Sequence, residues 1–263
     1  MTRTGPSLVR RIEPCWGTVI GVHVDDAVDP RAVDDVFRWF RRVDDLFSTW
    51  RDDTEISRIG RGELEIADAA PEVQEVLVAC EQIRRETRGA FDITIGGRAE
   101  VEPRRLAPID PSGFVKGWAL ERAVEMLGAV GVSRCSLNAG GDVVVRGRID
   151  DQPWRIGIQH PWERDKVAEV LEVGSGAVAT SGRTERGDHV IDPRTRRPAT
   201  GLVSVTVVGP DLGTADALAT AAVACGSIAE PWLARRPGVA AFAITDDGAV
   251  LVTAGLERYR AAA

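Results

Sequence analysis

Several common features are missing from this sequence, and each absence excludes a class of protein. No apolar run is long enough to span a bilayer, and residues 1–12 contain neither the apolar segment of a signal peptide nor a lipobox-like cysteine. We therefore expect no membrane insertion and a cytoplasmic location. The net charge of -7 provides no excess of cations for a phosphate backbone, so no nucleic-acid partner is expected despite a local basic patch at residues 194–197.

Familiar metal and nucleotide motifs are missing as well. The chain has no CxxC and no HExxH, and its three histidines are far apart, which argues against zinc and other transition metals. It has neither a Walker A loop nor a GxGxxG between a strand and a helix, which disfavours the usual nucleotide-binding folds. The four cysteines have no paired spacing and are predicted to be reduced core thiols: Cys15, Cys80, Cys135 and Cys225.

The order of hydrophobic patterns indicates the fold class. Apolar residues recur at helical spacing over 32–50, and further helices are predicted from Pro71 to about Gly89 and over 116–127. This order favours an α+β fold with mixed, mostly antiparallel sheets, either one domain over 1–263 or two intimately packed halves, with no repeat or linker. Strands are predicted at 17–24, 135–137, 143–146, 154–158, 169–173, 177–180, 203–208, 240–244 and 249–253.

The segment DALAT carries the most specific chemistry. Thr214 can cap a helix that Gly226 can end, which places Asp216 in the first turn and Thr220 on the same face. A carboxylate beside a hydroxyl is a typical pair of ligands for Mg²⁺. The alternative is an ordinary helix turn, in which the aspartate complements the helix dipole and the threonine bonds back to a carbonyl.

Four other stretches combine glycine with polar residues, as expected where backbone approaches a ligand: FDITIGG, DPSGFVKGW, NAGGD and ATSGRTERGDHVIDP. Together with DALAT, and in this order, they resemble the ApbE family of FAD:protein FMN transferases. WGT at 16–18, STWR at 48–51 and WRIGIQHP at 154–161 extend the resemblance to roughly residues 16–226. The resemblance implies an ApbE-like, T-fold-related architecture.

The resemblance also implies a reaction. FAD would bind as substrate, and its FMN half would pass to a Thr or Ser hydroxyl of a target flavoprotein, releasing AMP with the help of Mg²⁺. Two alternatives use the same residues. One is an FAD pyrophosphatase, in which water replaces the protein hydroxyl to give FMN and AMP. The other is a flavin-binding or storage protein without catalytic activity.

The resemblance assigns roles to particular residues. Asp216, Thr220 and the carbonyl of Gly113 would hold the metal. Lys116 would neutralise phosphate, although a lysine at the start of a helix is more often solvated. His189 would take the proton of the acceptor hydroxyl or donate to a phosphate oxygen, unless it is only a half-exposed histidine held by a neighbouring aspartate. The predicted catalytic set is therefore His189, Asp216 and Lys116.

A larger set would contact FAD, through aromatic stacking or polar groups. Some of these positions have simpler explanations. Trp50 can be the last apolar residue of the first helix, Gly140-Gly141 can be a hairpin turn, and Asp110 can fix its own loop. The predicted FAD-binding residues are Trp16, Trp50, Phe91, Thr94, Asp110, Lys116, Asn138, Asp142, His189 and Val190.

The chain departs from the family pattern in two places. The segment 96–109 is much shorter than the usual family connection, and Arg183-Thr184 replaces a frequent aromatic after ATSG. In addition, Ala219 stands where some members carry a second acid, which leaves one close carboxylate in that turn. The first two departures concern recognition of the acceptor protein and stacking on the isoalloxazine ring, not the metal and phosphate residues.

Overall fold

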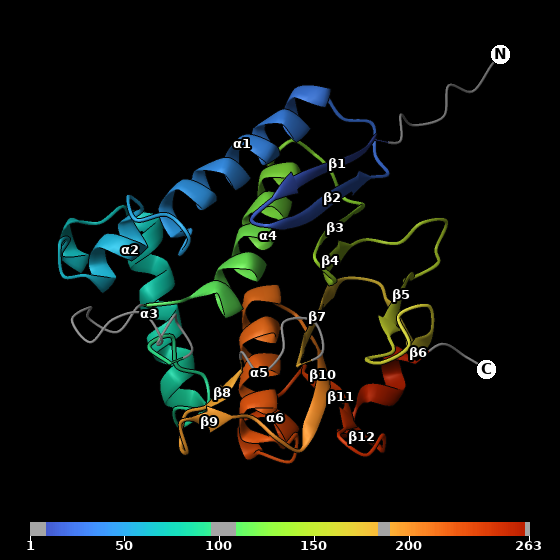
Figure 1. Ribbon diagram of the computed structural model, residues 1–263. Helices are drawn as coiled ribbons and strands as arrows, with labels where there is room; N and C mark the ends of the chain where they lie inside the picture. Colours follow the sequence, from blue (N-terminus) through green and yellow to red (C-terminus); the bar gives the residue numbers. More distant parts are fainter. Residues whose placement is uncertain (1–8, 96–108, 184–189, 261–263) are drawn as a thin grey trace.

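An eight-stranded antiparallel sheet forms the centre of the protein in the computed structural model, which describes residues 9–95, 109–183 and 190–260 (Figure 1). The predicted α+β fold with antiparallel sheets is confirmed. Its strands, in spatial order, are β1 (Val9–Cys15), β2 (Thr18–Val24), β3 (Cys135–Ala139), β4 (Asp142–Arg146), β7 (Gly176–Gly182), β10 (Leu202–Gly209), β11 (Ala240–Thr245) and β12 (Val250–Val252). Two short hairpins pair β5 (Trp154–Gln159) with β6 (Val167–Val173) and β8 (Ile191–Asp192) with β9 (Arg197–Pro198).

Helices cover one face of the sheet. α4 and α5 pack directly on the strands, α1 crosses α4, and α2 and α3 lie further from the sheet (Figure 1). The β5–β6 hairpin packs on the opposite face. No helix within the described residues is long and apolar enough to cross a membrane. The helices are α1 (Pro30–Phe47), α2 (Glu55–Gly60), α3 (Pro71–Glu86), α4 (Ser112–Ala129), α5 (Leu212–Cys225) and α6 (Pro231–Ala234), with 3-10 turns η1 (Ile66–Asp68) and η2 (Leu256–Tyr259).

Helix α1 is shorter than its apolar pattern predicts. Its buried stripe ends at Phe47, and Ser48 is extended rather than helical. The carbonyl of Ser48 accepts a hydrogen bond from Thr54 Oγ1 at 2.9 Å, and Thr54 in turn caps α2. The chain therefore turns into α2, and Trp50 lies beyond the helix with 77% of its surface exposed. The reading of Trp50 as the last residue of the stripe was wrong.

Residues 9–15 form an edge strand, although the sequence reads as a polar leader there. β1 pairs with β2 from Val9 opposite Val24 to Cys15 opposite Thr18. The two-residue turn between them has positive φ at Trp16 and Gly17, which is the geometry that closes a tight antiparallel hairpin. The strand escaped prediction because an edge strand with one solvent-facing side carries few apolar residues.

Helices α4 and α5 approach each other closely at two glycines. A Cβ added at Gly117 would lie 2.5 Å from the backbone C and O of Leu212, and one at Gly213 would lie 2.9 Å from the Phe114 ring. The two backbones can touch only because both positions are glycine. This contact fixes how far α5 lies from Lys116, the neighbour of Gly117.

Substituting Gly117 with alanine tests this contact. The added methyl group would overlap the backbone of α5, so we expect Gly117→Ala to lower the free energy of unfolding by about 2 kcal/mol or more. Gly128 lies in the same helix, and a Cβ there meets nothing within 4 Å. Gly128→Ala should therefore be neutral or stabilising, by roughly 0.5–1 kcal/mol. Equal denaturant midpoints for the two variants would contradict the close contact.

Candidate active site

Helix α5 begins three residues earlier than predicted. Asp211 is its N-cap, and its carboxylate accepts a hydrogen bond from the backbone N–H of Thr214 at 2.7 Å. The prediction that Thr214 caps the helix was wrong, because the Asp211 carboxylate takes that place. Asp216 is thus in the second turn, where the helix dipole is already weak, so dipole compensation does not account for this carboxylate. The predicted end at Gly226 is confirmed, with φ of 66°.

Asp216 is a buried carboxylate with an unsatisfied oxygen. The residue is 2% exposed, and its Oδ2 atom makes no hydrogen bond with any described residue. Burial is the main cause that raises the pKa of Asp216 above its ordinary value, and the ammonium of Lys116 opposes the shift. Burying a carboxylate oxygen without a well-formed hydrogen bond costs free energy, which points to a ligand that completes the site.

Lys116 lies between two carboxylates. Its Nζ atom donates a hydrogen bond to Asp142 Oδ2 and lies 3.3 Å from Asp216 Oδ2, within ion-pair distance. Only 29% of its side chain is exposed. The reading of Lys116 as a solvated lysine at a helix start is therefore not what the structure shows. When both carboxylates are ionised, they face a single ammonium, and the cluster then has one excess negative charge.

Thr220 and Gly113 meet one turn along α5 from Asp216. A Cβ added at Gly113 would lie 3.2 Å from Thr220 Oγ1 and 3.4 Å from the Phe91 ring, so the backbone of the α4 start lies against the threonine hydroxyl. Thr220 Oγ1 also lies 2.9 Å from Ser181 Oγ on β7. The hydroxyl therefore has a side-chain partner, in contrast to the alternative in which it only bonds back to a helix carbonyl.

Ser181 is a residue that the sequence reasoning missed. A strand was predicted at 177–180, and the motif ATSG was grouped with the glycine-containing, loop-like stretches, whereas strand β7 continues through the whole motif to Gly182. Along this strand Ala177 and Ala179 are buried in the core under the helices, and Ser181 follows with the same side-chain direction. This alternation was the signal that could have placed Ser181 beside the DALAT helix.

Several predicted FAD-binding residues gather at the start of α4. Phe91 is 4% exposed and lies beside Gly113. The backbone N–H of Asp110 donates to the carbonyl of Ile93 at 2.8 Å, which joins this residue to the segment that contains Thr94. The carboxylate of Asp110 accepts from the N–H of Ser112 at 3.0 Å, so it does fix its own loop, as the simpler reading supposed.

A second group lies on two neighbouring hairpins. Trp16 is held against α1: its Nε1 atom donates to the carbonyl of Phe40 at 2.9 Å, and the two rings meet edge to face at 5.2 Å. Asn138 precedes the Gly140-Gly141 turn, where both glycines have positive φ, and its Oδ1 atom accepts from the N–H of Gly141 at 3.2 Å. The hairpin reading of this motif is therefore correct. The two hairpins touch, because a Cβ at Gly140 would lie 2.9 Å from Thr18 Oγ1.

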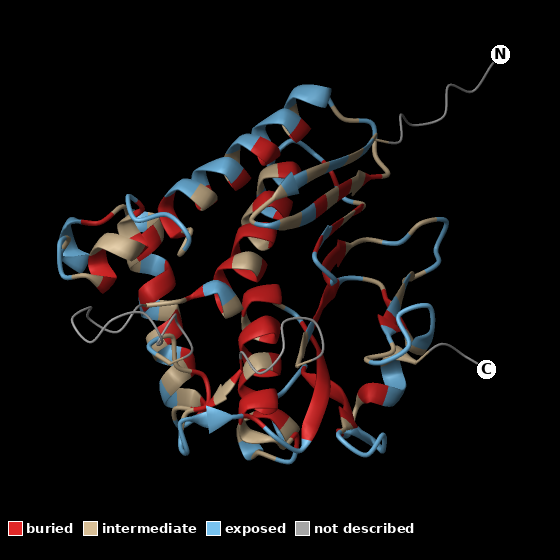
Figure 2. Ribbon diagram, viewed as in Figure 1, coloured by how far each residue is buried: buried red, intermediate tan, exposed pale blue. Residues whose placement is uncertain are grey.

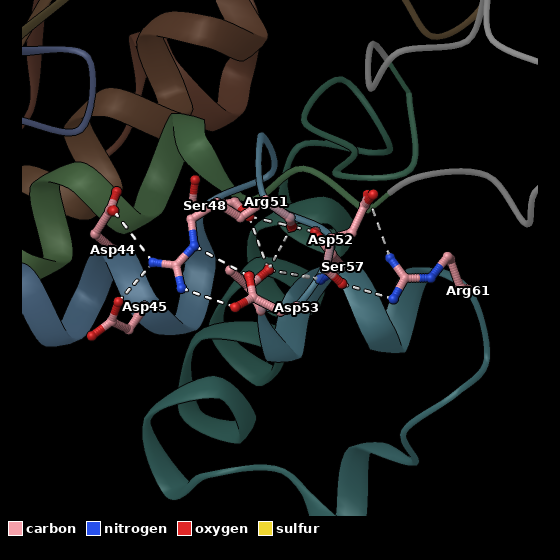
Figure 3. A network of polar contacts seen from close by, with 9 residues as sticks. Asp44, Asp45, Ser48, Arg51, Asp52, Asp53, Ser57 and Arg61 are labelled. Atoms are coloured by element: carbon pink, nitrogen blue, oxygen red, sulfur yellow. Dashed lines mark hydrogen bonds and ion pairs between the residues drawn. The ribbon is translucent and has the colours of Figure 1, made fainter.

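The remaining predicted FAD-binding residues either lie away from these two groups or fall outside the residues that the structure describes. The side chain of Val190 is 8% exposed and belongs to the core under the helices. His189 falls outside the described residues. Trp50 is exposed beside Arg51, whose guanidinium is held by Asp45 at 2.7 Å and Asp53 at 3.1 Å (Figure 3). This network gives the α1–α2 connection a fixed shape next to the exposed side chain of Trp50.

Helix α5, which carries Asp216, is much more buried than helix α1 (Figure 2). Helix α5 is buried along most of its length, including Asp216, whereas α1 exposes its outer face. A charged side chain in the middle of such a helix is unusual unless it has a function.

The family of the chain follows from comparison with known proteins. The sequence pattern of the ApbE family matches residues 16–102 and 98–243, most of the chain. The chain belongs to the ApbE family. An FAD:protein FMN transferase of Rhodobacter capsulatus is 38% identical over 171 residues, which cover 62% of this chain and 33% of that protein. One from Vibrio cholerae is 30% identical over 270 aligned residues, covering 81% of this chain and 80% of that protein.

Solved ApbE structures share the fold. The ApbE protein of Thermotoga maritima has a TM-score of 0.85 and 25% sequence identity, covering 97% of this chain and all of that one. The flavin transferase ApbE from Vibrio cholerae has a TM-score of 0.81 and 25% identity, covering 96% and 99%. The predicted resemblance and ApbE-like fold are confirmed.

The residues present fit the Mg²⁺ that the ApbE family implies. Asp216, Thr220 and the carbonyl of Gly113 are hard oxygen ligands of the kind Mg²⁺ prefers. The unsatisfied Oδ2 of Asp216 and the excess negative charge both favour a cation at this point. Within the described ranges no three His, Cys, Asp or Glu side chains are grouped to hold a metal. A cation here would therefore depend on hydroxyl and carbonyl oxygens beside one aspartate.

Neutralising Asp216 should stabilise the metal-free protein. We expect Asp216→Asn to raise the free energy of unfolding at pH 8 by about 1–2 kcal/mol, because it removes a buried charge while Lys116 keeps Asp142 as its partner. The advantage should shrink as the pH falls through the raised pKa of Asp216, because protonation removes the same charge from the wild type.

Added Mg²⁺ should reverse this difference in stability between the wild type and Asp216→Asn. The cation should raise the melting temperature of the wild type and leave that of Asp216→Asn unchanged, since only the wild type binds it. Thermal unfolding with and without Mg²⁺ measures both effects. A variant less stable than the metal-free wild type, or one stabilised equally by Mg²⁺, would refute this account of Asp216.

Proposed function

We propose that this protein is an Mg²⁺-dependent flavin transferase that moves the FMN half of FAD to a Thr or Ser hydroxyl of a target flavoprotein and releases AMP. The observation that carries the proposal is the buried, unsatisfied Oδ2 of Asp216, one turn from Thr220 and the Gly113 backbone. Relatives named FAD:protein FMN transferase, at up to 38% identity, support it. The target flavoprotein and the cytoplasmic location remain predictions.

The reaction exchanges one P–O bond for another. The acceptor oxygen attacks the phosphorus nearer the riboflavin, the bond from this phosphorus to the oxygen of AMP breaks, and the acceptor proton passes to a base. Mg²⁺, when bound, would stabilise the charge that grows on the phosphate oxygens. Asp216, Thr220 and the Gly113 carbonyl would hold the cation. Lys116, already in the cluster, would neutralise further phosphate charge.

The remaining predicted residues fit the two ends of FAD. We assign the aromatic rings of Trp16, Trp50 and Phe91 to stacking or apolar contact with the flavin or the adenine. Thr94, Asp110 and Asn138 would supply polar side chains or backbone groups around the same segments, and Val190 would contribute a backbone group from its own segment. His189 is proposed as the base for the acceptor hydroxyl, because an imidazole titrates near neutral pH.

A matched pair of threonine variants tests the metal site. Thr220 and Thr206 each share a hydrogen bond with another hydroxyl, at 2.9 Å and 2.8 Å, but Thr206 pairs with Thr180. Thr220→Val should lower Mg²⁺-dependent AMP release from FAD by roughly 100-fold or more, because it removes a ligand at the reacting charge. Thr206→Val should retain nearly wild-type turnover.

The assay uses purified protein, FAD and Mg²⁺, with and without a Thr-containing acceptor protein. AMP release that requires the acceptor and leaves covalent FMN on it supports transfer. AMP with an equal amount of free FMN would assign an FAD pyrophosphatase instead. FAD binding without AMP in either condition would assign a flavin-binding protein. Normal turnover by Thr220→Val would refute the metal assignment.

His189 is tested separately. We expect His189→Asn to lower the turnover number much more than the affinity for FAD, since the asparagine side chain cannot accept the hydroxyl proton. Single-turnover rates and FAD titrations separate the two effects. A variant that changes only FAD affinity would show that His189 binds the substrate without moving a proton.

A further inference from the structure

The ammonium of Lys116 is shared unequally between its two carboxylates. It makes its hydrogen bond with Asp142 Oδ2, whereas Asp216 Oδ2 lies 3.3 Å away and keeps no hydrogen-bond partner among the described residues. Both carboxylates are buried, at 1% and 2% exposure. The preference for Asp142 therefore does not come from a difference in solvation, and its cause lies in how the residues are held.

Asp142 is held by the strands around it. It is the first residue of β4, directly after the Gly140-Gly141 turn. Its Oδ1 atom accepts from the backbone N–H of Thr180 on β7 at 2.9 Å, which leaves Oδ2 as the oxygen that faces Lys116. Two strands of the central sheet thus fix the point at which the ammonium is held.

We propose that Asp142 is a positioning residue that holds the ammonium of Lys116 and so keeps Asp216 Oδ2 free for the cation. The inference rests on the proposed function, because it concerns the same metal site. If Asp142 lost its charge, Asp216 would be the only carboxylate left beside the ammonium. The cluster would then be neutral, and the cation would have to displace a buried ion pair in order to bind.

This role differs from the one the sequence predicts for Asp142. A residue that contacts FAD has to present a free polar atom, whereas both carboxylate oxygens of Asp142 bond to protein groups and the residue is 1% exposed. Its influence on the reaction would therefore pass through Lys116 and Asp216. Binding of a divalent cation in the absence of FAD is the property that it should control.

The test is the affinity for Mn²⁺, measured by the electron paramagnetic resonance signal of the free ion, without FAD. Asp142→Asn keeps an oxygen for the N–H of Thr180 and replaces the charged oxygen that faces Lys116. We expect the dissociation constant for Mn²⁺ to rise roughly tenfold, because a nearby negative charge is lost and Asp216 gains the ammonium. Thermal unfolding confirms that each variant is folded.

Asp26→Asn is the matched control. Asp26 also accepts backbone hydrogen bonds, from Ser133 and Arg134 at 2.6 Å and 2.7 Å, and pairs with the Arg134 guanidinium, but it follows the far end of β2 from the Trp16-Gly17 turn. This variant should bind Mn²⁺ as the wild type does. An equal loss of affinity in Asp26→Asn and Asp142→Asn would overturn the proposal, because the loss would then reflect general destabilisation.

Lys116→Gln shows whether the effect passes through the lysine. Its amide can still donate to Asp142, but the competing positive charge is gone, so Mn²⁺ should bind at least as tightly as in the wild type. In this background Asp142→Asn should weaken binding much less than it does alone. An undiminished effect, or weaker Mn²⁺ binding by Lys116→Gln itself, would overturn the proposal. If the wild type bound no Mn²⁺, the metal site of the proposed function would fail first.

Discussion

The touching backbones of α4 and α5 are the constraint on which the site depends. Gly117 and Gly213 allow an approach that any side chain at either position would prevent. The neighbours of this contact are the chemical groups themselves: Lys116 precedes Gly117, and Asp216 follows Gly213 by three residues. Because the contact is made by backbone, it fixes the separation between the main-chain positions of Lys116 and Asp216, from which the ammonium and the carboxylate extend. The central sheet adds Asp142 and Ser181 from two adjacent strands.

The cluster of Lys116, Asp142 and Asp216 destabilises the metal-free protein, and a bound cation would offset this free-energy cost. Two buried carboxylates share one ammonium, and one oxygen of Asp216 has no hydrogen-bond partner within the described part of the chain. Charge imbalance in a buried site destabilises the metal-free fold, and it supplies the free energy that binds a cation. A protein that only stored flavin would gain nothing from this arrangement. The imbalance is thus the structural feature that most favours phosphoryl-transfer chemistry.

Local sequence patterns predicted the helices and strands that depend mainly on residues close to one another in the chain. The helix predicted over 32–50, the Ala-rich helix that ends at Gly226 and the strand at 203–208 all appear in the structure close to their predicted positions, although the first helix ends at Phe47. The helix start at Asp211 was missed because two capping residues compete there. The edge strand at 9–15 was missed because its polar side hides the alternation. The order of the motifs identified the family, because this order is a property of the whole chain rather than of any one segment.

Which residues of the site contact one another was not predictable from local sequence patterns. Asp142 joins Lys116 and Thr180 across 26 and 38 residues of sequence, and Ser181 meets Thr220 across 39. No local pattern records such pairings, because they arise from the strand order β4-β7 and from the position of α5 on the sheet. The sequence therefore named most members of the site but not which of them touch. This distinction changed the role proposed for Asp142.

The central claim is that Asp216 holds a divalent cation together with Thr220 and the Gly113 backbone. The most direct measurement is the anomalous scattering of Mn²⁺ in crystals grown with FAD. We predict a single strong peak within about 2.5 Å of Asp216 Oδ2, Thr220 Oγ1 and the Gly113 carbonyl oxygen, next to the FAD pyrophosphate. A map in which FAD is bound, no peak lies at Asp216, and the Lys116 ammonium bonds to its Oδ2 would contradict the account.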